Sequence, residues 1–464
     1  MKKFLATSLA VLMLVGMLAA CGGPQPAQPD ATGTTAEADA GAATPDPAAA
    51  APAGGGSGTL YIMSFTTEIG DMFKGFKDAH PEFPYEVNAD NVVAQTDGAY
   101  QTALDAALVA GGNLVPDIYG AESAEVLRYT QGTMSQYAAT YKALGIDVDA
   151  KIAAAEIAKY AVDIGTRDGE VVALPYQATG GAFIYRRSIA KDVWGTDDPA
   201  VIKTKIGPDW ETFFASAEEL KAKGYAIVSG DGDLWHPVEN SSDQGWIVDG
   251  KLYLDPKREA FLDLSKRLMD NGYHNDTRDW DEPWYADMRG EGPKPTFGFY
   301  GPAWLINYTI GAQAPDTTGD WAICEPTIGF SWGGTWVVAH KDTDMADAAK
   351  QYIEWITLDT SDTGLQYQWA NGMLNEAGTK DTVASAVVMA KSNGESAFLG
   401  GQNMFDIFIP AGANATGHLK TQYDQNINDI WRDQVRAYTA GNKDRDTAIA
   451  DFKQNVLDQL GLES

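Results

Sequence analysis

From residue 58 onward, short β-rich runs alternate with longer amphipathic segments. The run Thr59–Phe65 precedes a predicted helix with Met72 and Phe76 on one face, and a glycine pair at 111–112 ends a second predicted helix. Another β-rich run, 116–120, follows shortly after that pair. Strands separated by helices of this length are typical of βαβ units, which build parallel sheets. We therefore expect an α/β fold.

Later segments continue the pattern. Asp255 and Pro256 form a helix-start signal, and Gly272 follows the last apolar residue of that helix. The tail, 425–460, predicts two further helices. The part from 58 to 464 is longer than the roughly 250–300 residues that one core usually supports, so we expect two lobes. Hydrophobic residues are 44% of the chain, which is enough to fill both cores.

The N-terminus predicts export and membrane attachment. Lys2 and Lys3 precede an apolar run that ends in Leu18-Ala19-Ala20-Cys21. The run is shorter than the roughly 20 residues of a membrane-spanning helix, so residues 1–20 are better interpreted as a secretory signal peptide. Leu-Ala-Ala-Cys resembles a bacterial lipobox, which implies acylation of Cys21 and an extracytoplasmic protein anchored to the cell membrane. Residues 21–57 have the composition of a flexible linker.

Charge and cysteine content narrow the possible partners. The net charge of −30 argues against nucleic acid, because phosphate binding needs clustered Lys and Arg. Cys324 is the only cysteine besides Cys21, so the globular part has no disulfide, and its apolar surroundings predict a core residue. We expect no metal and no cofactor. The acidic turn 276–282 has oxygen ligands suited to Ca²⁺, but its spacing does not match a calcium loop, and we favour a solvated turn.

Five motifs containing glycine or aromatic residues occur in order along the chain. They are Val109-Ala110-Gly111-Gly112 with Pro116-Asp117-Ile118, Ala173-Leu174-Pro175-Tyr176 before a glycine pair, Gly301-Pro302-Ala303-Trp304, Trp332-Gly333-Gly334-Thr335-Trp336, and Phe398-Leu399-Gly400-Gly401-Gln402-Asn403. Together they resemble the extracellular solute-binding proteins of family 1, which include the maltose-binding protein. The resemblance implies a two-lobe periplasmic-binding-protein fold of type II, in the cluster of carbohydrate binders. It also implies a monomer that closes on its solute and docks on the permease of an ABC importer.

The resemblance further implies that the chain crosses between the lobes near 176–181, 326–329 and 371–375. Paired glycines suit such a hinge, because they absorb backbone rotation at low cost. The implied lobes are an N-terminal one, 58–177 and 327–373, and a C-terminal one, 178–326 and 374–464.

The residue types favour a carbohydrate as the solute. A sugar ring presents C–H groups that lie well on an aromatic face, and its hydroxyls need Asp, Glu, Asn or Gln at the edges. Many of the 13 Trp and 20 Tyr lie in glycine-rich or polar turns. Trp332 is the best candidate, because two glycines separate it from Trp336. The predicted polar turn 230–237 adds Asp231, Asp233 and Trp235.

Other expected contacts follow strand ends or turns. Glu122 follows a predicted parallel strand, where binding loops usually lie. Trp304 stands one place later than the tryptophan that follows Gly-Pro in the family, which puts its stacking role in question. The remaining expected contacts are Phe65, Glu68, Tyr176, Gln177, Tyr300, Gln402 and Asn403. Core positions stay open for Tyr176, Trp235 and Trp336. Trp280 and Trp284 suit either the rim of a site or an acidic surface turn, and we favour the turn.

Two alternatives remain. A secreted glycoside hydrolase would need two carboxyls flanking a bond, such as Asp231 and Asp233, but two Asp in a glycine turn are more simply loop formers. A peptide or polyamine is the nearer alternative, because acidic groups around aromatic rings also suit a cation. We expect a binding protein and not an enzyme.

Overall fold

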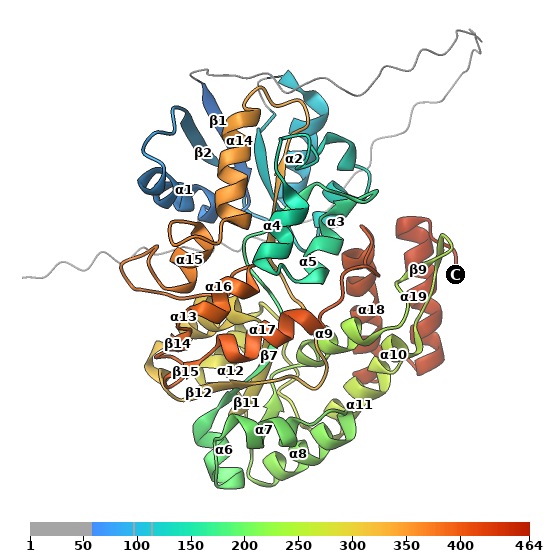
Figure 1. Cartoon of the computed structure of the whole chain (residues 1–464). Coiled ribbons are helices and arrows are strands. Elements are labelled where there is room, and N and C mark those ends of the chain that lie inside the picture. The colour runs from blue at the N-terminus through green and yellow to red at the C-terminus, as the bar shows by residue number, and fades with distance from the viewer. Residues whose placement is uncertain (1–57, 96–97, 113–114) are drawn as a thin grey trace, which may run out of the picture. The chain divides into compact units, whose positions relative to one another are not determined.

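A five-stranded sheet and a four-stranded sheet organise the chain (Figure 1). The structure is a computed structural model that describes residues 58–95, 98–112 and 115–464. The predicted signal peptide, Cys21 and the predicted linker lie outside the described residues.

The first sheet has the strand order β2-β1-β3-β13-β6. β1 (Thr59–Ser64) pairs in parallel with β2 (Glu86–Val92) and β3 (Ile118–Glu122), as the βαβ pattern predicts. β13 (Thr335–Ala339) runs antiparallel between β3 and β6 (Ala173–Pro175). The carboxyl ends of β1, β3 and β6 therefore lie at the same edge as the amino end of β13.

The second sheet has the order β12-β7-β11-β8. β8 (Ala226–Val228) is parallel to β11 (Thr296–Gly301). β7 (Ala182–Arg186) runs antiparallel between β11 and β12 (Trp321–Cys324). The carboxyl ends of β8 and β11 thus meet the amino end of β7 at one edge. The short strands are β4 (Thr166–Arg167), β5 (Glu170–Val171), β9 (Ile247–Val248), β10 (Lys251–Leu252), β14 (Glu395–Ser396) and β15 (Gln402–Asn403).

Helices connect and cover the strands. Up to β8 they are α1 (Glu68–Ala79), α2 (Ala99–Ala110), α3 (Val126–Thr130), η3 (Ser135–Tyr137), α4 (Val148–Ala155), α5 (Lys159–Ile164), α6 (Arg187–Trp194), α7 (Pro199–Ile206) and α8 (Trp210–Ala222). Between β8 and β13 they are α9 (Gly232–Ser241), α10 (Pro256–Glu259), α11 (Phe261–Asn271), α12 (Glu282–Arg289), η4 (Leu305–Ile310), α13 (Gly311–Gln313) and η5 (Pro315–Thr317). After β13 they are α14 (Ala346–Ile353), η6 (Glu354–Leu358), α15 (Leu365–Ala370), α16 (Ala386–Lys391), α17 (Phe405–Asn414), α18 (Asp424–Thr439) and α19 (Arg445–Leu460).

Aspartates begin several of these helices. Asp255 accepts a hydrogen bond from the Lys257 backbone N–H at 2.8 Å ahead of α10, which confirms the predicted helix start. Asp444 caps α19 in the same way, through the N–H of Thr447 at 2.7 Å. Each cap satisfies a backbone donor that the first helical turn leaves without an internal partner. The two helices predicted for the tail are confirmed as α18 and α19.

Three apolar clusters form the core. Along β7, Phe183 and Tyr185 belong to a cluster on one face of the second sheet, and Ile184 belongs to another on the opposite face. The cluster of Ile184 continues to Leu60 of β1 in the first sheet. A third cluster, which includes Trp336, covers the other face of the first sheet. The two sheets are thus joined by packed side chains as well as by the chain itself.

The chain passes from the first sheet to the second between β6 and β7, and returns between β12 and β13. The two crossing segments touch, because the Gly181 N–H donates to the Phe330 carbonyl at 2.9 Å. A Cβ on Gly181 would lie 1.9 Å from the Phe330 ring, so only glycine fits there. Thr382 of a third segment donates its hydroxyl to the Ala178 carbonyl at 2.7 Å. The lobe boundaries expected from the sequence stay a prediction.

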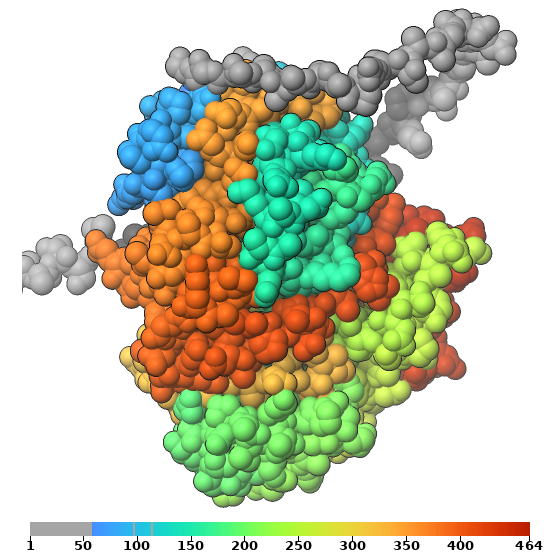
Figure 2. All heavy atoms as spheres, in the orientation of Figure 1, coloured from blue at the N-terminus to red at the C-terminus, as the bar shows by residue number. Residues whose placement is uncertain are grey.

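The helices after β13 bridge the two sheets. α16 packs against α4, and α17 packs against both α5 and β7. In Figures 1 and 2 these orange-red segments lie between the blue-to-teal first part of the chain and the green segments around α7 and α8. On the face shown in Figure 2, their side chains cover the boundary between the two parts.

One local prediction is wrong. The sequence predicted a polar turn over 230–237, but α9 occupies most of it. Gly232 starts this helix, and its next turn carries Trp235 into the core against Phe261, with ring centroids 5.0 Å apart. The helix was not predicted because Asp and Gly have low intrinsic helix propensity. Burial of its apolar face stabilises the helix in the folded protein.

Two predictions about single features can be compared with the structure. Cys324 is 1% exposed in β12, which confirms its core position. Burial raises the pKa of its thiol, so the thiolate needed for nucleophilic chemistry is suppressed. In the described part of the chain, every helix is too short or too polar to cross a bilayer.

We predict that Gly181→Ala destabilises the protein by about 1–3 kcal/mol, because the new methyl group overlaps the Phe330 ring at the crossing. Urea unfolding measures the change. Gly412→Ala is the matched control: its new Cβ would meet its nearest neighbour, Ala158, at 3.7 Å. A Gly181→Ala protein as stable as the control would contradict the tight crossing.

Candidate functional site

Polar side chains from both halves of the chain meet beyond the carboxyl ends of β1 and β6 of the first sheet. We call Glu68, Tyr176, Gln177, Asn307 and Asp381 the junction cluster. Glu68 is the first residue of α1 and accepts a hydrogen bond from the Tyr176 hydroxyl. Asp381 accepts from the Asn307 side-chain amide at 3.0 Å and from the Gln177 side chain. α1 of the first half is thereby connected to η4 of the second.

The carboxyls of the junction cluster are held partly protonated. Burial raises the pKa of Glu68 to about 7; the Tyr176 hydrogen bond opposes this rise, and the nearby Asp381 adds to it. Burial also raises the pKa of Asp381 to about 6. Within the described residues neither carboxyl forms an ion pair with Lys or Arg. The cluster can therefore both donate and accept hydrogen bonds near neutral pH.

Four rings pack beside one another in the second half. We call His236, Trp280, Trp304 and Trp332 the ring cluster. Trp280 lies parallel to Trp304, with centroids 5.8 Å apart and planes 10° apart. Trp304 meets Trp332 edge-on at 4.9 Å, and its indole N–H donates to the Trp332 carbonyl at 3.0 Å. His236 stacks on Trp332 with centroids 4.0 Å apart.

Trp280 is the outermost of these rings and is 52% exposed. Its φ of 71° lies in the left-handed region, which is rare for a bulky side chain and costs on the order of 1–3 kcal/mol. Strain of this kind persists only where the surroundings hold it, and it is common at binding sites. An exposed, strained indole stacked on a second indole is a platform on which a flat apolar face can lie.

The segment 332–335 joins the ring cluster to the edge of the first sheet. Gly333 and Gly334 have φ values of 73° and 109°, which favour glycine. A Cβ on Gly333 would lie 3.0 Å from the Trp304 indole nitrogen, so the missing side chain also makes room for that ring. Thr335 then pairs with Glu122 across the β3–β13 ladder. The two glycines explain the Trp-Gly-Gly-Thr-Trp pattern.

Glu122 is a third carboxyl at this edge. It ends β3 and accepts a hydrogen bond from the Ala124 N–H at 2.6 Å. Burial raises its pKa to about 7, the Ala124 hydrogen bond opposes the rise, and the neighbouring Glu125 adds to it. The sequence placed Glu122 correctly at the carboxyl end of a parallel strand.

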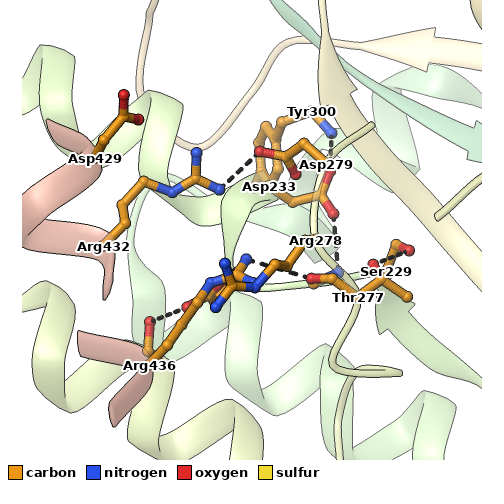
Figure 3. A network of polar contacts seen from close by, with 12 residues as sticks. Ser229, Asp233, Thr277, Arg278, Asp279, Tyr300, Asp429, Arg432 and Arg436 are labelled. Carbon is orange, nitrogen blue, oxygen red and sulfur yellow. Dashed lines mark hydrogen bonds and ion pairs between the residues drawn. The ribbon is translucent and has the colours of Figure 1, made fainter. Parts of the chain in front are cut away.

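A polar network that includes Asp279 and Arg432 is next to Trp280 in the chain (Figure 3). The Asp279 side chain precedes Trp280 and accepts from the Arg432 guanidinium at 2.7 Å. His236 lies nearby; burial lowers its pKa to about 4, with Asp279 opposing the drop, so its ring is neutral at pH 7. Its Nε2 is buried without a hydrogen-bond partner among the described residues.

The structure brings together five of the side chains expected from the sequence. They are Glu68, Tyr176 and Gln177 in the junction cluster and Trp304 and Trp332 in the ring cluster. Tyr176 is buried, but its hydroxyl reaches Glu68. Trp304 contributes to the ring cluster despite its one-residue shift. Phe65 is half-buried at the end of β1, edge-on to Tyr100 at 5.6 Å. Their part in ligand binding stays a prediction.

Three aromatic residues expected to present their rings lie in the interior instead. Trp235 is 2% exposed inside α9. Trp336 is 1% exposed, and its indole N–H donates to the Ala161 carbonyl at 3.0 Å. Tyr300 shares a 2.6 Å hydrogen bond with the Thr327 hydroxyl. Each lies on an element that is buried on nearly all sides, so the local sequence pattern does not show which of its aromatic rings are core.

Four polar residues expected at the site are occupied by protein partners. Asp231 pairs with Arg436 at 2.8 Å, and Asp233 accepts from the Tyr300 N–H at 2.9 Å. Gln402 accepts from the Ile323 N–H at 2.9 Å and donates to its carbonyl at 2.8 Å, completing the edge of β12. The Asn403 side chain accepts from the Phe405 N–H at the start of α17. Asp231 and Asp233, the carboxyl pair considered for the hydrolase alternative, are thus both bonded to protein groups.

Sequence reasoning missed several members of the site. Asn307 and Tyr308 follow Trp304 by three and four residues, so helical spacing could have found them. Tyr308 is 49% exposed, and the pKa of its hydroxyl is raised by burial and then by Asp381 and Glu68. Trp280 was considered as a rim residue but favoured as a surface turn. No local signal marked Asp381, which follows the last crossing.

Other features of the described residues do not add to this site. No three of their His, Cys, Asp and Glu side chains gather as metal ligands would. A cavity of 530 Å³, with Asp149, Asp168 and His418 in its lining, and one of 370 Å³ beside Arg278 and Arg436 share no residue with either cluster.

Solved structures share this fold. An extracellular solute-binding protein of family 1 is 18% identical, covers 85% of this chain and 98% of its own, and has a TM-score of 0.70. The galacto-N-biose/lacto-N-biose I-binding protein of the ABC transporter from Bifidobacterium longum, in complex with lacto-N-biose, is 15% identical with a TM-score of 0.65, over 88% and 99%. An ABC-transporter-associated binding protein from B. animalis subsp. lactis, in complex with beta-1,6-galactobiose, is 19% identical with a TM-score of 0.60, over 86% and 97%.

These likenesses extend over nearly the whole of each solved chain, so the fold is the two-lobe fold of periplasmic solute-binding proteins. No curated protein matches the chain. The family model for bacterial extracellular solute-binding proteins matches residues 71–371, which include β3, β13 and all four residues of the ring cluster. This chain belongs to the bacterial extracellular solute-binding proteins.

Proposed function

We propose that this protein is the substrate-binding lipoprotein of an ABC importer and captures a sugar or oligosaccharide between its lobes. The observation that carries the proposal is the ring cluster: an exposed indole stacked on a second one, beside carboxyls that both donate and accept hydrogen bonds. A pyranose needs this combination of flat apolar surface and polar edge. The sugar complexes among the structural neighbours support the same class of solute.

The proposal assigns a role to each part of the chain. Cys21 carries the lipid anchor, 21–57 spans the distance to the lobes, and the lobes act as a monomer that delivers the solute to a membrane permease. The buried pairings of Asp231 and Asp233 favour a binding protein over a glycoside hydrolase, because both carboxyls are already bonded to protein groups.

A cationic solute, such as a polyamine, is the second candidate. It is favoured by one observation. Asp381 bonds to Asn307, three residues after Trp304, and Glu122 pairs with Thr335, three residues after Trp332, yet within the described residues neither these carboxyls nor Glu68 forms an ion pair. The two classes differ in their response to pH. An amine would bind more tightly as pH rises through 7, because the carboxyls ionise; a neutral sugar gains nothing from that ionisation.

Titration of intrinsic Trp fluorescence with oligosaccharides, polyamines and peptides tests the proposal. We expect the oligosaccharides to change the emission, because Trp280 and Trp304 would contact the ring. A change with amines alone, growing stronger from pH 6 to pH 8, would replace the sugar with a cation.

We predict that Trp332→Ala weakens sugar binding by about 1–3 kcal/mol, since the indole backs both Trp304 and His236. Isothermal titration calorimetry gives the dissociation constant. Trp210→Ala, which removes a half-buried indole from the start of α8, is the matched control and should leave binding unchanged. Equal affinity in the two variants would exclude Trp332 from the site.

We predict a pH-dependent effect of Glu68→Gln. The folded state holds the Glu68 proton up to a pKa of about 7, so this group stabilises the fold at low pH and loses that contribution as pH rises from 4.5 to 7. Relative to the native protein, the variant should gain about 1–3 kcal/mol of stability between pH 5 and pH 8. Urea unfolding at both pH values measures the gain. Glu86→Gln on the exposed strand β2 controls for the lost charge, and an identical response of both variants would contradict a buried Glu68.

Replacement of Cys21 tests the anchor. We expect Cys21→Ala to abolish labelling by a fatty-acid analogue and to move the protein from the membrane fraction into the soluble one, because the anchor depends on the thioether. Immunoblots of fractionated cells measure the distribution. Persistent membrane binding without label would point to an uncleaved hydrophobic segment.

A further inference from the structure

The strained turn before α12 needs a support that Trp280 itself does not provide. Half of the Trp280 surface is exposed, and its φ of 71° is unfavourable for an aromatic residue. Its contacts with Trp284, Trp304 and Trp332 are contacts between rings, and the turn is closed by the Asp281 N–H, which donates to the Arg278 carbonyl at 3.2 Å. Thr277 bonds to Ser229 at the start of this segment, and the side chain next to Trp280, Asp279, ties the turn to helix α18.

Asp279 is fixed by an ion pair with Arg432. Its carboxylate oxygen Oδ2 lies 2.7 Å from the Arg432 Nη2, and the two side chains are 9% and 20% exposed. Burial acts to raise the Asp279 pKa, but Arg432 and then His236 outweigh burial, so the pKa is lowered and the carboxylate stays ionised. A mostly buried, hydrogen-bonded ion pair holds its geometry much better than a solvent-exposed one.

The same pair also fixes the start of α9. A Cβ on Gly232 would lie 2.2 Å from Asp279 Oδ1 and 2.7 Å from Arg432 Nη2, so the ion pair presses directly on the first residue of this helix. One turn later α9 carries His236, which stacks on Trp332. The pair thus lies between two elements that each hold one member of the ring cluster.

Arg432 reaches this position from α18, the second-last helix of the chain (Figure 3). Arg436, one helical turn further on, binds Asp231 at 2.8 Å, directly before α9. The two arginines therefore point from one face of α18 toward the same pair of segments. Arg432 Nε is buried without a partner among the described residues, so Asp279 is the contact that orients the guanidinium.

We infer that Arg432 is a positioning residue for solute binding: through Asp279 it holds Trp280 parallel to Trp304 and so sets the aromatic surface on which the solute stacks. This inference rests on the proposed function and names a determinant of the same site. The role requires a guanidinium, whose planar fork has a fixed direction, and a lysine ammonium reproduces only the charge.

The first test needs no ligand. The Trp280 ring centroid lies 5.3–5.8 Å from those of Trp284, Trp304 and Trp332, so their electronic transitions couple, and the exciton couplet that Trp280→Ala removes from the circular dichroism spectrum is the contribution of Trp280. We expect Arg432→Gln to remove the same couplet and to increase acrylamide quenching, and Arg432→Lys to retain part of it. An unchanged couplet in a folded Arg432→Gln protein would overturn the inference.

The second test is a double-mutant cycle on the affinity for the oligosaccharide that responds in the fluorescence titration. Arg432→Gln should weaken binding about tenfold in the native background and less than about twofold in a Trp280→Ala background, because its effect passes through that ring. Equal losses in both backgrounds would overturn the inference. Arg128→Gln, which breaks the comparable Arg128–Asp105 pair at 2.5 Å in the first half, is the matched control and should change neither the couplet nor the affinity.

The two tests separate the inference from the proposed function. If no oligosaccharide binds while the couplet responds as expected, the sugar proposal fails and the positioning of Trp280 by Arg432 stands. If Arg432→Gln does not fold, Arg432→Lys decides: a native couplet and native affinity in that variant would contradict the need for a guanidinium.

Discussion

The contact between the two crossing segments is the constraint on which the rest of the structure depends. Gly181 donates its N–H to Phe330 with no space for a side chain between them, and Gly180 forms a bridge with Ser331. Trp332 follows directly, so the close approach of the two chains determines where its ring lies. The same crossing delivers Thr335 to the edge of the first sheet, opposite Glu122. The contact at Gly181 thus positions both the Trp332 ring and, three residues later, Thr335, which pairs with Glu122.

Buried carboxyl groups near this crossing and near the rings are accommodated in two different ways. The chain carries a net charge of −30, yet Glu68, Glu122 and Asp381 lie near the crossing without a cationic partner in the described part. Burial of an unpaired carboxylate is costly, and the groups respond by raising their pKa values. A carboxyl near its pKa exchanges readily between donor and acceptor, which suits hydroxyl groups that do both. Asp279, next to Trp280 in the chain, differs from these groups: its pKa is lowered and it stays ionised because it pairs with Arg432.

The sequence predicted those features that depend on local pattern. The α/β fold and the helix that Asp255 begins follow from periodicity and capping. The location of Glu122 at a strand end also follows, because parallel sheets place their carboxyl ends together. Which aromatic rings stay exposed could not be predicted. Trp235 and Trp336 differ from Trp280 only in the long-range packing of their elements, and that packing is absent from a local window.

The ring cluster shows why a local sequence window cannot predict which rings stay exposed. His236, Trp280, Trp304 and Trp332 come from four separate segments, and the arginine that supports them lies 100 residues after the last ring. Each ring depends on contacts that close long loops, whose entropic cost is met only when both sheets are already formed. The site is therefore a product of the assembled fold and not of any one motif. This explains why the outermost indole, in a turn that resembles ordinary acidic surface, was passed over.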